Sequence, residues 1–253
     1  MYSPQEIYQN YVTVAKNKTS AAWYKTLILA VFAGAFIAFG AAASTASSAT
    51  LAGSWATVVK SAVFPVGLIL VVICGAELFT GNCLLIAPAV GKDIKITSLL
   101  KNWGIVYGGN LIGGVLIAVI VVYGGTQSVA IKEACITVAA NKCNMNFGLA
   151  LLRAIPCNML VCLAVWAAMS SKSVAGKILA IFFPIFAFVA CGFEHSVANM
   201  YYLTAGLLSG SAEGLNIGNA VLCLISTTLG NIIGGALIAL SMHLLYRQKK
   251  TEE

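Results

Sequence analysis

The sequence predicts an all-α membrane protein with six transmembrane helices, arranged as two inverted three-helix repeats whose second and fifth helices are broken. Composition is the first reason, because 60% of the 253 residues are hydrophobic, only 9% are charged and the mean hydropathy is +0.91. The second is a series of apolar runs long enough to cross roughly 30 Å of hydrocarbon. The third is an internal repeat.

The apolar runs give six crossings, and two of these are unusual. The second and fifth runs hold about thirty residues, or roughly 45 Å as a straight helix, and each carries charge near its middle. We therefore expect both to be interrupted. The six runs cover residues 25–45, 58–90, 102–123, 147–169, 178–208 and 217–245.

The polar N-terminal segment lacks the apolar core of a signal peptide and is amphipathic, which indicates an interfacial helix. If both termini are cytoplasmic, eleven basic residues lie inside and four outside, as the positive-inside rule requires. The outer four are Lys60, Lys132, Lys142 and Arg153. We expect a cytoplasmic N-terminal segment over 1–24, one transmembrane domain over 25–246 with repeats at about 25–123 and 147–246, and a cytoplasmic tail over 247–253.

Two motifs occur twice in the same order. CGAELFTGN at 74–82 matches CGFEHSVAN at 191–199 with an offset of 117, and GNLIGGVLIA at 109–118 matches GNIIGGALIA at 230–239 with an offset of 121. Each half holds three crossings, an odd number, so the second half enters from the opposite side and the repeat is inverted. The Gly-x-x-x-Gly spacing in the second motif favours close helix packing, within or between subunits.

The first motif places Glu77 and Glu194 at symmetry-related points near the bilayer centre. A carboxylate there costs about 2.5 to 3.5 kcal/mol, so both must face protein or water. Two interpretations stay open: the carboxylates accept hydrogen bonds from backbone N–H groups freed at the breaks, or they contact a solute. Asn82 and Asn199 each follow the glutamate by five positions.

Helices that resume near Thr80 and Ser196 would direct unpaired N–H groups and positive dipole ends at the midplane, which favours an anion. His195 is the residue of this region whose charge can change near physiological pH. Its place in a symmetry-related break, beside a glutamate, indicates a functional role.

Three segments now indicate a family: GAELFTGN, NMLVCLAVW at 158–166 and FEHSVANMYY at 193–202. Through them the chain resembles the formate/nitrite transporter family. The resemblance implies a homopentamer of aquaporin-like protomers in a bacterial inner or plasma membrane. Each protomer would have its own pore for small monovalent anions such as formate, nitrite or hydrosulfide. The cysteine-rich, strongly apolar sequence looks most like the hydrosulfide branch.

The resemblance also assigns residues. The family's central histidine falls on His195, its hydroxyl partner on Thr80 and its outer-vestibule lysine on Lys142. Its hydrophobic constrictions fall on Phe64, Leu68, Phe79, Val161 and Phe188.

These assignments suggest a mechanism. An anion collects near Lys142, passes a constriction and meets His195 and Thr80. Because a bare charge in an apolar constriction is costly, a proton from His195 could neutralise a weakly acidic anion.

Other classes fit less well. A water or glycerol channel would carry Asn-Pro-Ala at its breaks, and a membrane enzyme would need a metal or nucleophile motif; the sequence has neither. A proton-coupled formate or nitrite symporter remains an alternative.

The basic residues lie at the ends of apolar runs and form no continuous patch, which argues against a nucleic-acid partner. Eight cysteines without a C-x-x-C pair predict no metal and no cofactor, although Cys135 and Cys143, in one exposed loop, could pair.

Overall fold

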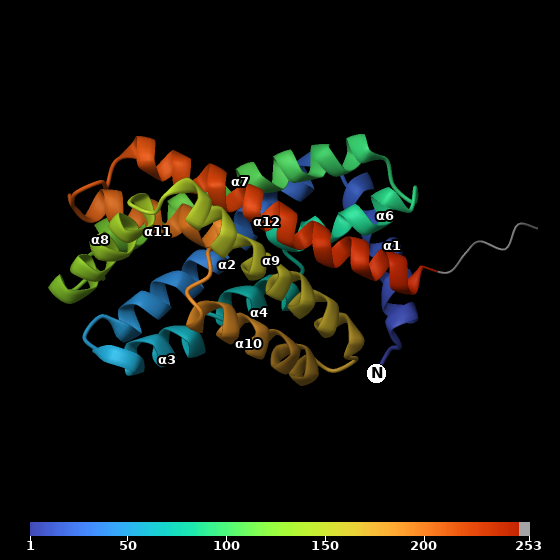
Figure 1. Ribbon diagram of the computed structural model, residues 1–253, viewed down its shortest axis with the longest axis horizontal. Coiled ribbons are helices and arrows are strands. Elements are labelled where there is room, and N and C mark those ends of the chain that lie inside the picture. The colour runs from blue at the N-terminus through green and yellow to red at the C-terminus, as the bar shows by residue number, and fades with distance from the viewer. Residues whose placement is uncertain (248–253) are drawn as a thin grey trace, which may run out of the picture.

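Within the part of the chain that the structure describes, five helical segments are long and apolar enough to cross a membrane. The computed structural model describes residues 1–247, and all of its regular secondary structure in that range is helical (Figure 1). A sixth apolar helix, α10 (Val174–Ala190), is shorter. The five long segments are α2 (Trp23–Ser48), α3 (Gly53–Val63) continued by α4 (Val66–Ile73), α7 (Ile96–Tyr123), α9 (Phe147–Ser170) and α12 (Ile217–Tyr246).

Two apolar segments are interrupted where the sequence predicts breaks. After α4 the chain leaves helical geometry over residues 74–78, the first break, and after α10 it does so over residues 191–195, the second break. Gly75 and Gly192 have φ angles of 73° and 67°, which residues with a Cβ rarely adopt. Helix resumes as α5 (Phe79–Asn82), η1 (Cys83–Leu85) and α6 (Ile86–Val90) after the first break and as α11 (Ser196–Ser209) after the second.

The two halves use glycine in the same way to bring long helices together. Helix α7 lies against α2, and α12 lies against α9. A Cβ on Gly113 would overlap the backbone of Val31, and a Cβ on Gly234 would overlap that of Ile155. The glycine motifs therefore pack helices within one chain.

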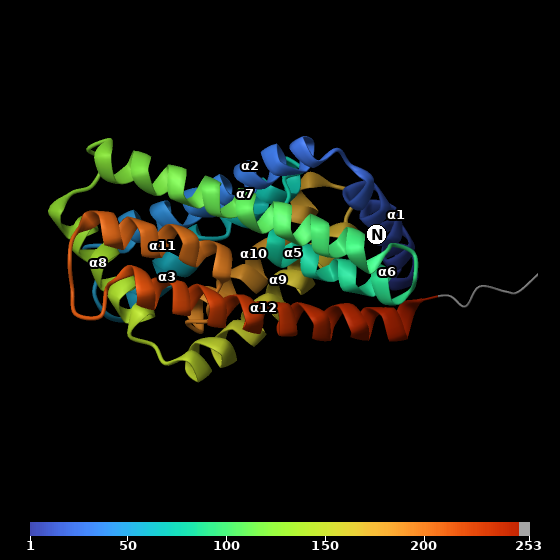
Figure 2. The ribbon, with the colours of Figure 1, turned by 90° about the horizontal axis from the view of Figure 1, so that it is seen from above.

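Two further helices, α1 (Pro4–Ser20) and α8 (Val129–Cys143), lie at opposite ends of the molecule (Figure 2). Helix α1 begins with a capping box between Ser3 and Glu6. It packs at the end where α12 finishes, and the Tyr8 hydroxyl lies 2.8 Å from His243 Nδ1. Burial raises the pKa of the Tyr8 phenol, so the hydroxyl keeps its proton and can donate it to His243.

The structure corrects the interpretation of residues 129–143 as an exposed loop. They form α8, which packs against α11, and both Cys135 and Cys143 are buried and free rather than paired with each other. Cys143 packs in a small apolar cluster with Leu203, Ala220 and Cys223. The predicted tail lies outside the described residues from position 248 onward, and so do Lys249 and Lys250, two of the eleven basic residues predicted to lie inside.

Candidate transport site

An asparagine from α7 holds the first break. Asn110 Oδ1 accepts the N–H of Phe79 at 2.9 Å, and its amide nitrogen donates to the carbonyl of Glu77 at 2.9 Å and to that of Ala30 at 2.8 Å. One fully buried side chain thus satisfies two backbone groups that the interrupted helix leaves unpaired, and it also ties the break to α2 through Ala30. The break is a fixed feature of the fold.

Asn231 of α12 does the same at the second break. Its Oδ1 accepts the N–H of Ser196 at 2.8 Å, and its amide nitrogen donates to the carbonyls of Glu194 at 3.0 Å and Ala154 at 2.8 Å. Sequence reasoning missed both asparagines. The signal was present, since each is the second residue of the repeated GN-x-IGG motif, but only the glycines were interpreted.

The glutamate of each break is paired with a lysine and the asparagine five positions later. Glu77 Oε1 lies 2.8 Å from Lys18 Nζ, and its Oε2 accepts from Asn82 at 2.6 Å. Of the two interpretations left open, hydrogen bonds from backbone N–H groups are not found at this carboxylate within residues 1–247, where its partners are Lys18 and Asn82.

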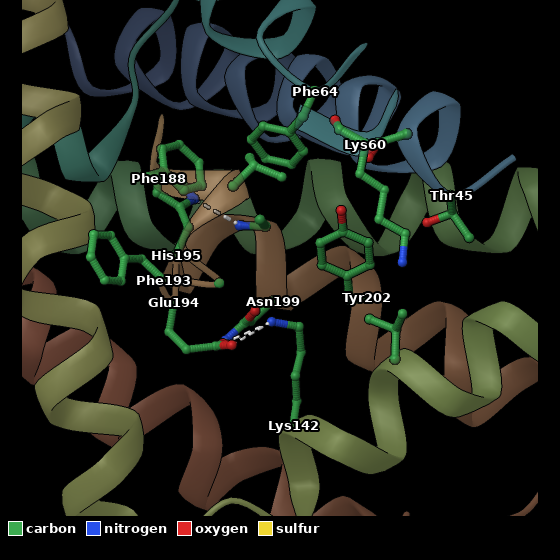
Figure 3. A pocket seen from close by; sticks show the side chains of 15 residues that line it. Thr45, Lys60, Phe64, Lys142, Phe188, Phe193, Glu194, His195, Asn199 and Tyr202 are labelled. Carbon is green, nitrogen blue, oxygen red and sulfur yellow. Dashed lines mark hydrogen bonds and ion pairs between the residues drawn. The ribbon is translucent and has the colours of Figure 1, made fainter. Parts of the chain in front are cut away.

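Figure 3 shows the corresponding cluster at the second break. Lys142 Nζ lies 2.9 and 2.8 Å from the two carboxylate oxygens of Glu194, and Asn199 donates to Glu194 Oε2 at 2.8 Å. Here too the backbone N–H of Ser196 goes to Asn231 and not to the carboxylate.

Lys18 is a site residue that sequence reasoning counted only as a topology signal. It comes from α1 and Lys142 from α8, and these helices precede α2 and α9 in the two halves. The two lysines are 124 residues apart, close to the offsets of the repeated motifs. That spacing could have revealed both the pair and the helical character of residues 129–143.

We expect Lys142→Met to lower the free energy of unfolding by about 3 kcal/mol, because it leaves the buried Glu194 carboxylate without its cation. Thermal unfolding in detergent measures this. Lys132→Met, which removes an exposed charge from the same helix, is the control. Lys142→Met combined with Glu194→Gln should recover most of the loss. Equal stability of Lys142→Met and Lys132→Met would contradict a structural role for the ion pair.

A polar contact between Thr80, in α5, and His195, in the second break, joins the two interrupted segments. Thr80 Oγ1 lies 2.9 Å from His195 Nε2, and the N–H of Ala198 donates to His195 Nδ1 at 3.1 Å. Because Nδ1 is an acceptor, the neutral ring carries its hydrogen on Nε2, which donates to Thr80. The N–H groups of Gly81 and Val197 have no hydrogen-bond partner within residues 1–247.

A cavity lies toward each end of the molecule. The Lys142 cavity, of about 220 Å³, is lined in part by Lys60, Lys142, Glu194 and His195 (Figure 3). The Lys18 cavity, of about 530 Å³, is lined in part by Lys18, Glu77, Asn82, Leu68 and Lys177. Since α8 and α1 lie at opposite ends, the two cavities approach the breaks from opposite directions (Figure 2).

The residues assigned to constrictions are all buried and belong to one large apolar cluster, but their immediate neighbours differ. Phe64 and Phe188 meet edge to face with ring centroids 5.5 Å apart, and Phe188 stacks on His195 at 5.9 Å. Leu68 lines the Lys18 cavity. Phe79 packs edge to face on Trp103 and Tyr107 of α7, and Val161 lies buried in α9.

Comparison with known proteins shows which family the chain belongs to. Residues 5–245 match the family model described as formate/nitrite transporter. The chain belongs to the formate/nitrite transporter family. It is 41% identical to an uncharacterized transporter, YrhG, of Bacillus subtilis over 98% of this chain and 94% of that protein. It is 38% identical to a probable formate transporter of Methanothermobacter thermautotrophicus over 95% of both chains.

A solved structure agrees with these relatives. A structure titled as a pentameric formate channel with formate bound superposes with a TM-score of 0.81 at 31% identity, over 88% of this chain and 97% of that one. Members of this family are channels and transporters, so this multi-pass membrane protein is a transport protein and not an enzyme.

Proposed function

We propose that the chain conducts small monovalent anions, with formate as the first substrate. The observation that carries this proposal is the contact between Thr80 and His195, which joins the two interrupted helices. The Lys142 cavity lies on one side of this contact and the Lys18 cavity on the other. Formate is favoured because a 38% identical relative and a 31% identical solved structure are named for it. Nitrite and hydrosulfide are further candidates of similar size and charge.

The architecture that goes with this function is six crossings in two inverted halves, an aquaporin-like plan, with both termini in the cytoplasm. This architecture is supported by two contacts that occur in both halves. Asn110 holds the first break as Asn231 holds the second, and Lys18 pairs with Glu77 as Lys142 pairs with Glu194. Helix α1 and the end of α12 also lie at the same end of the molecule (Figure 2). We further propose a homopentamer in the cell membrane, as in the solved formate channel.

The proposed path runs from one cavity to the other. An anion enters the Lys142 cavity, passes the Phe64–Phe188 pair and reaches the centre. There it accepts hydrogen bonds from His195 Nε2–H and the Thr80 hydroxyl, which replace part of the water that it loses. It leaves past Leu68 into the Lys18 cavity.

Proton transfer from His195 to a weakly acidic anion has one structural requirement. When Nε2 gives up its hydrogen, the ring stays neutral only if Nδ1 gains one, and Nδ1 now accepts the N–H of Ala198. Protonation at Nδ1 therefore has to break that hydrogen bond at the start of α11. The same constraint applies to a proton-coupled symporter that uses this ring.

Flux into proteoliposomes tests the proposed function. Formate, nitrite and hydrosulfide uptake by the purified chain would be compared at two pH values, with glycerol as an uncharged solute and protein-free liposomes as the baseline. We expect formate to enter much faster than it enters protein-free liposomes. Glycerol should enter at the same rate with and without the protein. Uptake of all three anions at the baseline rate would overturn the proposal.

Current reversal potential separates a channel from a symporter. With a formate gradient and no coupling, the reversal potential follows formate alone and does not move when a pH gradient is imposed. A shift with the pH gradient, at constant formate, would instead indicate that protons move with the anion. Formate uptake without current would indicate symport of one proton with each formate, because that pair carries no net charge.

A further inference from the structure

Each cavity has a second lysine that the ion pairs do not neutralise. Lys60 of α3 lines the Lys142 cavity, and Lys177 of α10 lines the Lys18 cavity. Both side chains are partly exposed, and neither forms an ion pair or a side-chain hydrogen bond within residues 1–247. Figure 3 shows Lys60 and Lys142 entering their cavity from opposite sides.

Lys60 and Lys177 are equivalent in the two halves. They are 117 residues apart, the same offset that separates Glu77 from Glu194. The chain therefore places the same pair of features in both cavities: a lysine held by a glutamate, and another lysine whose charge is left free. This correspondence could not be inferred from the resemblance, which assigned a lysine to one cavity.

The charge balance of each cavity determines what the free lysine does. In the Lys142 cavity the Glu194 carboxylate contacts the Lys142 ammonium with both oxygens, so that pair attracts a distant anion weakly. In the Lys18 cavity the negative charge of Glu77 and the positive charge of Lys18 offset each other in the same way. Lys60 and Lys177 are then the sources of net positive potential in the two cavities, where low-dielectric walls focus the field.

We propose that Lys60 and Lys177 are the anion-capturing residues of the pore, each acting on the anion that enters from its own end. This inference rests on the proposed function and extends it. Each lysine raises the local concentration of a small monovalent anion in its cavity before the anion reaches Thr80 and His195. It acts on entry and leaves passage through the centre unchanged.

Formate currents in patches excised from giant bacterial spheroplasts test this, because biosynthesis gives every channel the same orientation. At about 10 mM ionic strength, where the Debye length is about 30 Å, Lys60→Gln should lower entry from the Lys142 side about two- to tenfold. Lys177→Gln should lower entry from the other side by a similar factor. The two variants should therefore rectify in opposite directions.

Salt and matched variants make the result specific. At about 1 M ionic strength, where the Debye length is about 3 Å, both variants should approach the wild-type current. Lys132→Gln and Lys95→Gln remove exposed charges outside the two cavities and should not rectify. Lys60→Arg keeps the charge and should conduct like the wild type.

Two failures are distinguishable. If the wild type carries formate but Lys60→Gln and Lys177→Gln match their controls, or lose current equally in both directions at both salt concentrations, the capture role is overturned while the proposed function stands. If the wild type carries none of formate, nitrite and hydrosulfide, the proposed function fails and the capture role fails with it.

Discussion

Replacing His195 with phenylalanine is expected to lower formate flux about tenfold or more, because a hydrogen bond to a charged group contributes about 1.5 to 3 kcal/mol. The substitution removes the Nε2–H that meets Thr80 but keeps an aromatic ring to stack on Phe188. Flux of labelled formate into proteoliposomes, at matched protein content and at two pH values, measures the change.

His195→Asn separates conduction from folding in this experiment. His195 is the N-cap of α11, and its Nδ1 accepts the Ala198 N–H. Asparagine also caps helices well, whereas phenylalanine cannot accept this hydrogen bond. We expect both variants to lose flux while His195→Asn keeps near wild-type stability. Unchanged flux and unchanged pH dependence in the phenylalanine variant would remove the histidine from the mechanism.

Asn231→Ala is expected to lower the free energy of unfolding by about 3 kcal/mol or more. It leaves the N–H of Ser196 and the carbonyl of Glu194 buried without their partner, and each unsatisfied group costs about 1 to 3 kcal/mol. Loss of folded protein after detergent extraction and a lower unfolding temperature would show this.

Asn110→Ala should have an effect of similar size, since Asn110 makes the equivalent three hydrogen bonds at the first break. Ser241→Ala, an exposed position on α12, is the control and should leave stability within about 0.5 kcal/mol of the wild type. If the asparagine variants unfold at the same temperature as Ser241→Ala, the breaks are not held by these side chains.

The repeated motifs explain why both breaks could be predicted. A conformation with φ above zero favours glycine, and a charged residue interrupts an apolar run, so Gly75 with Glu77 and Gly192 with Glu194 mark the breaks in the sequence. The contact between His195 and Thr80 could not be predicted in the same way. His195 and Thr80 are not equivalent positions in the repeat, and only the family resemblance paired them.

Contacts from α1 and α8 could not be predicted from hydropathy. Both helices are short and carry several polar residues, so they give no apolar run long enough to cross a membrane, and α8 was interpreted as a loop. The partner of a buried carboxylate is a tertiary contact, which is why Lys18 was counted only for topology. The edge-to-face contacts of the Phe79 ring with Trp103 and Tyr107 are likewise tertiary, and spacing along the chain does not reveal them.

A double-mutant cycle between Thr80→Val and His195→Phe tests most directly whether the two breaks act as one centre. Formate conductance would be measured for the wild type, both single variants and the double variant. If the 2.9 Å contact makes one shared binding point, the double variant should conduct about as well as the poorer single variant. If instead the two losses multiply, Thr80 and His195 act independently and the anion does not pass through a shared contact.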